Sequence, residues 1–159
     1  MNPGFSPGQC MLPRMKRAPQ EIRTYFVTAV TAGRRSLFQV TSHAELFIDT
    51  LQSYHQQRKF ELYSFVVMPD HVHLLLTPAP EIPLEKAVQL IKGGFSFRLK
   101  SSFGVWERGY DNRRVVNSGQ YDACIQYIDQ NPAKAGLPET YPHSSKSHPG
   151  LVDSRPAWF

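Results

Sequence analysis

The feature of this 159-residue sequence that most constrains its fold is a repeated change of hydrophobic period. Segments with the two-residue period of strands are separated by segments whose apolar residues recur every three or four positions, as in helices. The strands are predicted at residues 25–31, 60–68, 71–77 and 105–116, the last one irregular near Gly109. The helices are predicted at residues 44–57, 84–101 and 119–130. Ser42 and Glu45 have the spacing of a capping box before the first helix, and Pro132 is expected to disturb or end the last one.

In chain order these segments read strand–helix–strand–strand–helix–strand, followed by one more helix. This order is typical of a ferredoxin-like α+β sandwich, in which a four-stranded antiparallel sheet (βαββαβ) carries two helices on one face. The third helix is an addition at the C-terminal side. We expect the other face of the sheet, or its edge, to be left free for a ligand, although a fold by itself gives no function.

Both ends of the chain lack this periodic pattern. Residues 1–20 are rich in Pro and Gly and carry three basic residues, which predicts a flexible basic arm. Residues 138–159 contain four prolines and several Ser and His residues, which predicts an irregular tail. Trp158 and Phe159, at its end, are candidates for folding back onto the body. Residues 21–137 remain as one folded domain.

The composition narrows the class of protein. Cys10 and Cys124 cannot form a disulfide framework or a Cys-rich zinc site. No apolar run approaches the roughly 20 residues of a membrane span, and the N-terminal region lacks the apolar run of a signal peptide. We therefore expect a cytoplasmic protein without a membrane partner. The 18 basic and 13 acidic side chains give a net charge of +5, which suggests a polyanionic partner without identifying it.

The most informative chemical feature is the pair His71 and His73 in the third predicted strand. Because side chains alternate between the faces of a strand, the two imidazoles project from the same side, and Val72 and Leu74 project from the other. Two neighbouring imidazoles at fixed spacing can chelate one divalent ion. The alternative is a pair of solvent-facing histidines with no ligand.

The second feature lies at the end of the last predicted helix. Tyr127 falls off the centre of the apolar stripe formed by Tyr121, Ile125 and Ile128, so the core does not require it. Asn131 follows four residues later and points in nearly the same direction. The alternatives are a half-buried amphipathic tyrosine and an asparagine that simply stops the helix before Pro132.

Taken together, these two features describe a possible phosphodiester site. A divalent ion held by His71, His73 and an oxygen of Asn131 would polarise a non-bridging phosphate oxygen, and Tyr127 would attack the phosphorus as a covalent nucleophile. A phenol holds its proton at neutral pH. The metal, nearby Lys or Arg side chains, or a base must therefore activate it.

The segments around these histidines and this tyrosine resemble those of a known family. Residues 67–75 (VMPDHVHLL) resemble the HUH motif of insertion-sequence tyrosine transposases. Residues 127–137 (YIDQNPAKAGL) resemble the block that contains their catalytic tyrosine, in the version characteristic of REP-associated tyrosine transposases. Residues 89–92 (QLIK), 105–110 (VWERGY) and 141–145 (YPHSS) also fit this group. The resemblance extends from about residue 23 to residue 145.

The resemblance implies single-stranded DNA cleavage and rejoining by one tyrosine, Tyr127, through a 5′-phosphotyrosine and a free 3′-OH. It also implies a ferredoxin-like fold, recognition of short palindromic REP-type hairpins, and residues 21–137 as the catalytic domain. Because imidazole ligands suit later metals and phosphate oxygens suit harder ones, we expect Mg²⁺, with Mn²⁺ as a substitute. The chain departs from the family pattern at Asn112, where a His often follows the Asp, and at His143, where a Trp is usual.

Two other classes compete with a transposase-type strand transferase. One is a protein of the same fold that binds DNA hairpins without cleaving them. The other is a different HUH enzyme, a replication initiator or relaxase, which the small size and the Asn131-Pro132 block disfavour. Whether the protein is a monomer or a dimer, and whether Tyr127 serves its own subunit's metal, is left open by the sequence.

Basic side chains are the candidates for DNA contacts. Lys92 and Lys100 share a polar stripe on the second predicted helix, and the others lie in loops or in the fourth strand. Each of them has the alternative of being an ordinary surface charge. The full candidate set is Arg34, Arg35, Lys92, Lys100, Arg108, Arg113 and Arg114.

Overall fold

A computed structural model describes residues 21–159, so the predicted basic arm at residues 1–20 lies outside the described residues. The strands are β1 (Thr24–Val30), β2 (Phe60–Met68), β3 (His71–Pro78) and β4 (Asp111–Val115). The α-helices are α1 (Thr41–Gln56), α2 (Leu84–Leu99) and α3 (Ser118–Lys134). The short 3₁₀ turns are η2 (Ala32–Arg34), η3 (Leu37–Gln39), η4 (Ser145–Ser147) and η5 (Pro149–Leu151).

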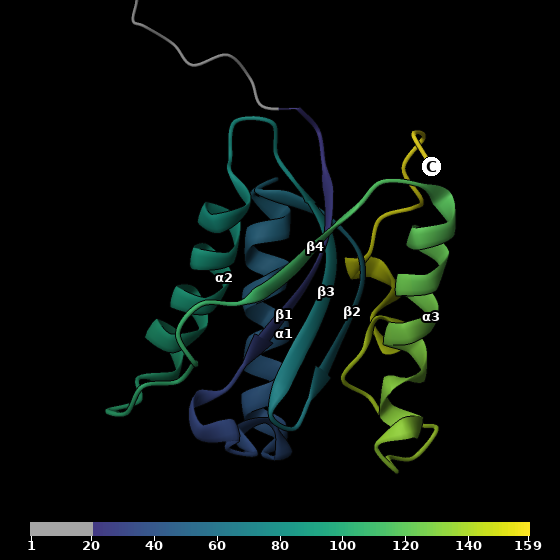
Figure 1. Cartoon of the computed structure of the whole chain (residues 1–159). Helices are drawn as coiled ribbons and strands as arrows, with labels where there is room; N and C mark the ends of the chain where they lie inside the picture. Colours follow the sequence, from purple (N-terminus) through teal and green to yellow (C-terminus); the bar gives the residue numbers. More distant parts are fainter. Residues whose placement is uncertain (1–20) are drawn as a thin grey trace, which may run out of the picture.

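The four strands form one sheet in the order β2-β3-β1-β4, and every neighbouring pair is antiparallel. Helices α1 and α2 cover one face of this sheet, and α3 lies on the other (Figure 1). The α+β sandwich predicted from the hydrophobic periods is therefore confirmed. None of the helices formed by residues 21–159 is long and apolar enough to cross a membrane.

The larger core lies between the sheet and helices α1 and α2. Val27, Val72 and Leu74 of the central strands face Phe47 of α1 and Phe95 of α2 across this core, and all five are nearly inaccessible to solvent. Alternate residues of β3 thus point into this core, and the residues between them point to the opposite face of the sheet.

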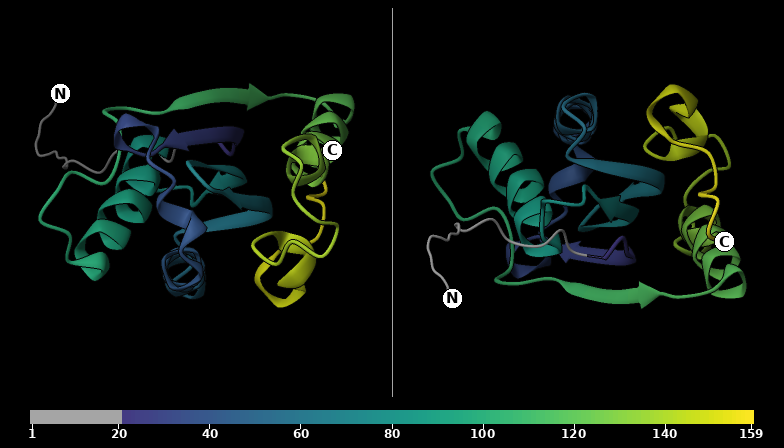
Figure 2. Two further views of the ribbon diagram at one scale, coloured as in Figure 1. Left: turned by 90° about the horizontal axis from the view of Figure 1, so that it is seen from below. Right: turned by 90° about the horizontal axis from the view of Figure 1, so that it is seen from above.

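The second face of the sheet is only partly free, which corrects part of the prediction. Tyr121 and Ile128 of α3 pack against Tyr63, Val66 and Leu75 of β2 and β3 in a smaller core. Helix α3 and the tail lie together on this side in two further views (Figure 2). The covered part is the β2–β3 side, because α3 contacts these two strands.

The tail at residues 138–159 runs along strand β2. The Val67 amide donates to the His143 carbonyl (2.8 Å), and the Asp153 amide donates to the Leu62 carbonyl (2.7 Å). Phe159 packs against Tyr121 of α3 with 5.3 Å between the ring centroids. The tail therefore covers the edge that β2 would otherwise expose.

Three local expectations were wrong. Helix α1 begins at Thr41 after Val40, with no side-chain cap, so Ser42 and Glu45 form no capping box. Strand β4 begins at Asp111 and not at residue 105, although the expected irregularity at Gly109 is present as a positive φ of 77°. Helix α3 continues through Pro132 to Lys134. Since Pro132 lies in the last turn, its missing amide removes only the bond to residue 128 and leaves the rest of the helix intact.

Candidate active site

The two histidines of β3 lie side by side on the sheet face that carries α3. Their ring centroids are 4.7 Å apart. His73 is buried and His71 is partly exposed. This arrangement follows from strand alternation, because Val72 between them points into the main core.

Each histidine is held through its Nδ1 atom. Asp70 Oδ1 lies 2.7 Å from His71 Nδ1, and Thr28 Oγ1 lies 2.8 Å from His73 Nδ1. Thr28 comes from β1, in direct register with His73. Because both Nδ1 atoms are engaged, the Nε2 atoms are the ones available to a ligand. His73 Nε2 is buried and has no hydrogen-bond partner.

The electrostatics of the pair favour a neutral His73. Burial lowers the pKa of His73 to about 4, and repulsion from His71 adds to the shift. Burial raises the pKa of Asp70, but hydrogen bonds from His71 and Arg34 outweigh this effect and hold that pKa below its ordinary value. A neutral His73 has the lone pair that a metal ion requires.

Tyr127 reaches the same place from α3. Its side chain is 45% exposed, and its ring centroid lies 5.3 Å from that of His73. Phe26 of β1 stacks on His73 at 5.3 Å and meets the Tyr127 ring edge-on at 5.8 Å. The Nζ atom of Lys134 lies 5.7 Å from the centroid of the Tyr127 ring. The phenol therefore stands beside both an imidazole and a cation while remaining open to solvent.

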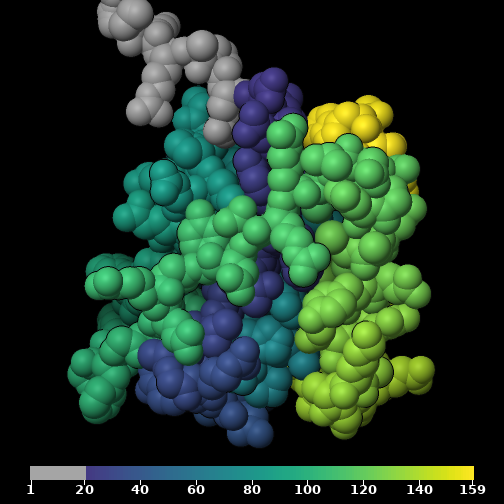
Figure 3. Space-filling view, in the orientation of Figure 1, coloured from purple at the N-terminus to yellow at the C-terminus, as the bar shows by residue number. Residues whose placement is uncertain are grey.

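These side chains line a cavity of about 840 Å³ between the sheet and α3, which we call the histidine pocket. Phe26, Thr28, His71 and His73 come from the sheet's central strands, and Tyr127 comes from the helix. In the space-filling view, atoms of the central strands are visible between those of β4 and α3 (Figure 3). The histidine pocket thus contains the unpaired Nε2 atom of His73 and the accessible phenol of Tyr127. Its volume leaves room for a backbone phosphate.

Residues 21–131 match the family model described as transposase IS200-like. The chain belongs to the IS200-like transposase family. Membership of this family supports a DNA-binding function similar to that of tyrosine transposases.

Similar proteins agree with the resemblance predicted from the motifs. The REP-associated tyrosine transposase of Escherichia coli K12 is 27% identical over 116 residues, which are 71% of this chain and 68% of that protein. A solved REP-associated tyrosine transposase bound to a REP hairpin has a TM-score of 0.71 at 22% identity, covering 93% of this chain and 94% of that one. A candidate transposase of Deinococcus radiodurans R1 has a TM-score of 0.50 at 25% identity, covering 74% and 96%. The structural likeness at 22% identity shows the fold alone.

Asn131 is not among the residues that line the histidine pocket. It lies one turn beyond Tyr127 on α3 and is half-buried. Asp111 of β4 does line the pocket, although sequence reasoning assigned it no role. The described residues contain no group of three His, Cys, Asp or Glu side chains placed to hold a metal ion. The donors present are nonetheless suitable for one, because two imidazole Nε2 atoms are not engaged by the hydrogen bonds that orient the rings.

The predicted DNA-contacting residues separate into groups. Arg34 and Arg113 line the histidine pocket, and Arg34 also pairs with Asp70 at 3.0 Å. Arg35 donates to the Gly104 carbonyl (2.7 Å), so it holds two loops together.

Lys92 has a similar structural role. Its Nζ donates to the carbonyls of Glu107 (3.2 Å) and Gly109 (2.6 Å), and burial lowers its pKa. It therefore fixes the segment before β4 instead of projecting into solvent. The three other candidates are exposed and do not line the pocket: Lys100, Arg108 and Arg114.

Besides Asp111, sequence reasoning missed four neighbours of the site: Phe26, Thr28, Asp70 and Lys134. Strand alternation places Phe26 and Thr28 on one face of β1, but only the register with β3 reveals that Thr28 meets His73. Lys134 follows Tyr127 by two helical turns, a spacing that could have indicated their contact.

Proposed function

We propose that this transposase is a metal-dependent single-stranded DNA endonuclease and strand transferase that acts at REP-type hairpins with Tyr127 as its nucleophile. The observation that carries the proposal is the position of the half-exposed Tyr127 phenol, 5.3 Å from the ring of His73. A tyrosine that served only packing would have no reason to stand beside a buried imidazole whose Nε2 lacks a partner.

The proposed reaction is an exchange of phosphoesters. The Tyr127 Oη–P bond forms as the P–O3′ bond breaks, which leaves a 5′-phosphotyrosine and a 3′-oxygen that takes up a proton. The phenol proton leaves to solvent, to which the half-exposed side chain gives access. Because the phosphotyrosine retains the phosphodiester bond, a 3′-OH can attack it and reseal the strand without another energy source.

The proposal assigns His71, His73 and Asn131 as the metal ligands. Asp70 and Thr28 orient the two imidazoles through Nδ1, as outer-shell partners of metal-bound histidines commonly do. A bound Mg²⁺ or Mn²⁺ would supply a positive charge that stabilises the charge developing on the phosphate oxygens. Asn131 would add an oxygen donor to the two nitrogen donors, a mixed set that accommodates Mn²⁺ as well as Mg²⁺.

The proposed substrate is a DNA hairpin with an adjacent single strand. A relative has been solved bound to a REP hairpin. In this chain the side chains of Arg34 and Arg113 lie at the pocket and would meet the phosphates that approach it. We assign the catalytic domain to residues 21–137, flanked by the arm at residues 1–20 and the tail at residues 138–159, and place the protein with DNA in the cytoplasm.

The test is formation of a covalent protein–DNA adduct. Single-stranded hairpin DNA is incubated with the protein and Mg²⁺ or Mn²⁺, and the products are separated under denaturing conditions. We expect an adduct that EDTA abolishes and that Tyr127→Phe does not form. Tyr121→Phe is the matched control, because Tyr121 is buried against the sheet and should leave the adduct unchanged. An adduct that persists in Tyr127→Phe would move the nucleophile elsewhere, with Tyr110 the next residue to test.

The histidine assignment has its own test. His71→Ala and His73→Ala should abolish adduct formation and leave hairpin affinity within a few-fold of the unmodified protein. An equal loss of affinity and cleavage would mean that the pair contacts DNA or supports the fold instead. Hairpin binding without cleavage in any metal would favour the binding protein over the enzyme.

A further inference from the structure

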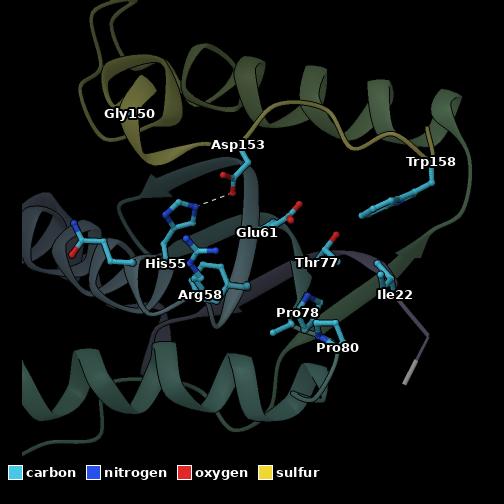
Figure 4. A pocket seen from close by; sticks show the side chains of 13 residues that line it. Ile22, His55, Arg58, Glu61, Thr77, Pro78, Pro80, Gly150, Asp153 and Trp158 are labelled. Atoms are coloured by element: carbon cyan, nitrogen blue, oxygen red, sulfur yellow. Dashed lines mark hydrogen bonds and ion pairs between the residues drawn. The ribbon is translucent and has the colours of Figure 1, made fainter. Parts of the chain in front are cut away.

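A second cavity, of about 710 Å³, lies at the other end of the sheet from the histidine pocket. It is bounded by the end of α1, the β2–β3 side of the sheet and the tail (Figure 4). Thr77 and Pro78 of β3 line it, whereas His71 begins the same strand at the histidine pocket. At about 3.3 Å per residue, six residues of strand separate the two cavities by about 20 Å.

One wall of this second cavity is an exposed aromatic ring. Trp158 is 49% exposed, although the adjacent Phe159 packs against α3. The Trp158 indole N–H donates to Thr24 Oγ1 (3.4 Å), which fixes the edge of the ring. Figure 4 shows Trp158 reaching in from the tail, with Pro78 and Pro80 across the cavity. A flat apolar face held in this way suits another flat ring.

The polar groups beside the ring are one acceptor and one donor. Glu61 is held by the Tyr63 hydroxyl at Oε1 (3.0 Å), and its second oxygen makes no hydrogen bond within the described chain. The Arg58 backbone amide donates to the His55 carbonyl (2.9 Å), but its guanidinium makes no hydrogen bond or ion pair with the residues that the structure describes. Arg58 keeps a positive φ of 59°, a conformation that favours Gly or Asn. A carboxylate oxygen and a guanidinium are therefore left for a ligand.

The remaining charged groups of the cavity are already paired. Asp153 Oδ2 accepts from the Leu62 amide (2.9 Å) and lies 2.8 Å from His55 Nε2. With one carboxylate and one guanidinium available, the cavity has no excess of positive charge for a phosphate. A flat, uncharged group with both donors and acceptors on its edge fits it better.

We propose that this second cavity binds one unpaired nucleobase of the single-stranded DNA, stacked on Trp158 and hydrogen-bonded along its edge by Glu61 and Arg58. The proposal rests on the proposed function, which makes single-stranded DNA the substrate. A base with an exocyclic amino group is preferred, because its N–H groups donate to the carboxylate and its ring nitrogen or carbonyl accepts from the guanidinium. Thymine has no amino group and fits less well.

The separation of the cavities limits which base this is. At the stacked spacing of about 3.4 Å per nucleotide, a distance of about 20 Å corresponds to no more than about six nucleotides. The base lies within this distance of the scissile phosphate, so the cavity would help to select where the strand is cut.

The experiment is an abasic scan of the DNA. Hairpins with a single-stranded extension receive one abasic site at each position within ten nucleotides of the cleavage point, and affinity is measured for the full chain and three variants. We expect one position, within about six nucleotides of the cleavage point, at which the abasic site weakens binding at least five-fold to the unmodified protein. The same abasic site should cost Trp158→Ala less than two-fold, whereas Trp158→Phe should retain most of the effect.

Arg58→Gln tests the same pocket without disturbing packing, because the Arg58 side chain is exposed and has no partner. It should lower the preference for amino-bearing bases over thymine at the sensitive position. A flat abasic scan, or a sensitive position that Trp158→Ala and Arg58→Gln leave unchanged, overturns the proposal. Adduct formation at saturating DNA separates the two hypotheses: an adduct with a flat scan refutes only the nucleobase pocket, whereas absence of any adduct refutes the proposed function.

Discussion

The hydrogen bond between Thr28 and His73 offers the sharpest test of the metal assignment. Metal binding at His73 Nε2 requires the ring proton to stay on Nδ1, where it donates to Thr28 Oγ1 at 2.8 Å. Thr28→Val keeps the shape of the side chain and removes the acceptor. The proton then has no partner at Nδ1, and the ring loses its preference for the tautomer that exposes the Nε2 lone pair.

Two magnitudes follow from this geometry. Leaving the largely buried Nδ1 group unpaired should lower the free energy of unfolding by about 1–3 kcal/mol. Loss of an outer-shell partner of a metal-bound histidine typically weakens metal affinity about 10- to 100-fold. This fold-change equals about 1.4–2.7 kcal/mol, so one lost hydrogen bond accounts for both effects.

The assay is titration of the protein with Mn²⁺, with free Mn²⁺ followed by electron paramagnetic resonance. Thr24→Val is the matched control, because Thr24 is a buried threonine of the same strand that bonds Thr77 Oγ1 (2.8 Å) far from the histidines. Both variants should lose similar stability in a denaturant melt, and only Thr28→Val should lose Mn²⁺ affinity. If Thr28→Val bound Mn²⁺ within two-fold of the unmodified protein, the reasoning from the tautomer would be refuted.

Three further outcomes are expected. Lys134→Met should slow adduct formation about three- to ten-fold without changing DNA affinity, because the Lys134 ammonium stabilises charge developing on the phenol by about 1 kcal/mol. An unchanged rate in single-turnover assays would contradict this prediction. Arg113→Ala should weaken hairpin binding and flatten its salt dependence by about one unit of slope. Arg114→Ala, on the opposite face of β4, should weaken hairpin binding less, and equal losses of affinity would contradict a DNA contact by Arg113 at the pocket. Phe95→Ala should lower the free energy of unfolding, measured in urea melts, by about 3–5 kcal/mol, because Phe95 is fully buried. Phe97→Ala should lower it by less than about 0.5 kcal/mol, because Phe97 is exposed, and similar losses would contradict the described core.

The sequence predicted those parts of the site that depend on local geometry. Strand alternation is a property of the backbone, so the separation of His71 and His73 from Val72 could be read directly from neighbouring residues. Likewise, Tyr127 could be seen to lie off the apolar stripe of its helix. The order of strands and helices also identified the sandwich, because few ways exist to cover one sheet with the helices between its strands.

Features that depend on distant contacts could not be predicted in this way. The polar stripe on α2 suggested a phosphate contact for Lys92, but the segment before β4 folds over this residue and supplies two carbonyls. Similarly, the four-residue spacing places Tyr127 and Asn131 on one face of a helix. It does not show which of the two reaches the histidine pocket when the helix packs on the sheet. The contact between Thr28 and His73 required the register of β1 against β3, which links residues 45 positions apart.

The histidines and the tyrosine of the candidate active site belong to different layers of the molecule, so the contact between these layers must be rigid. The histidines are fixed by the sheet, whereas Tyr127 is carried by α3, which is held by Tyr121 and Ile128 against β2 and β3. The tail reinforces this contact, because Phe159 packs on Tyr121 and Arg155 pairs with Asp122 at 2.8 Å. The position of the Tyr127 phenol relative to the imidazoles therefore depends on packing at the far end of α3. The proposed strand transfer would need such a rigid support, because attack on phosphorus by the phenol oxygen requires that oxygen to hold its alignment with the leaving 3′-oxygen.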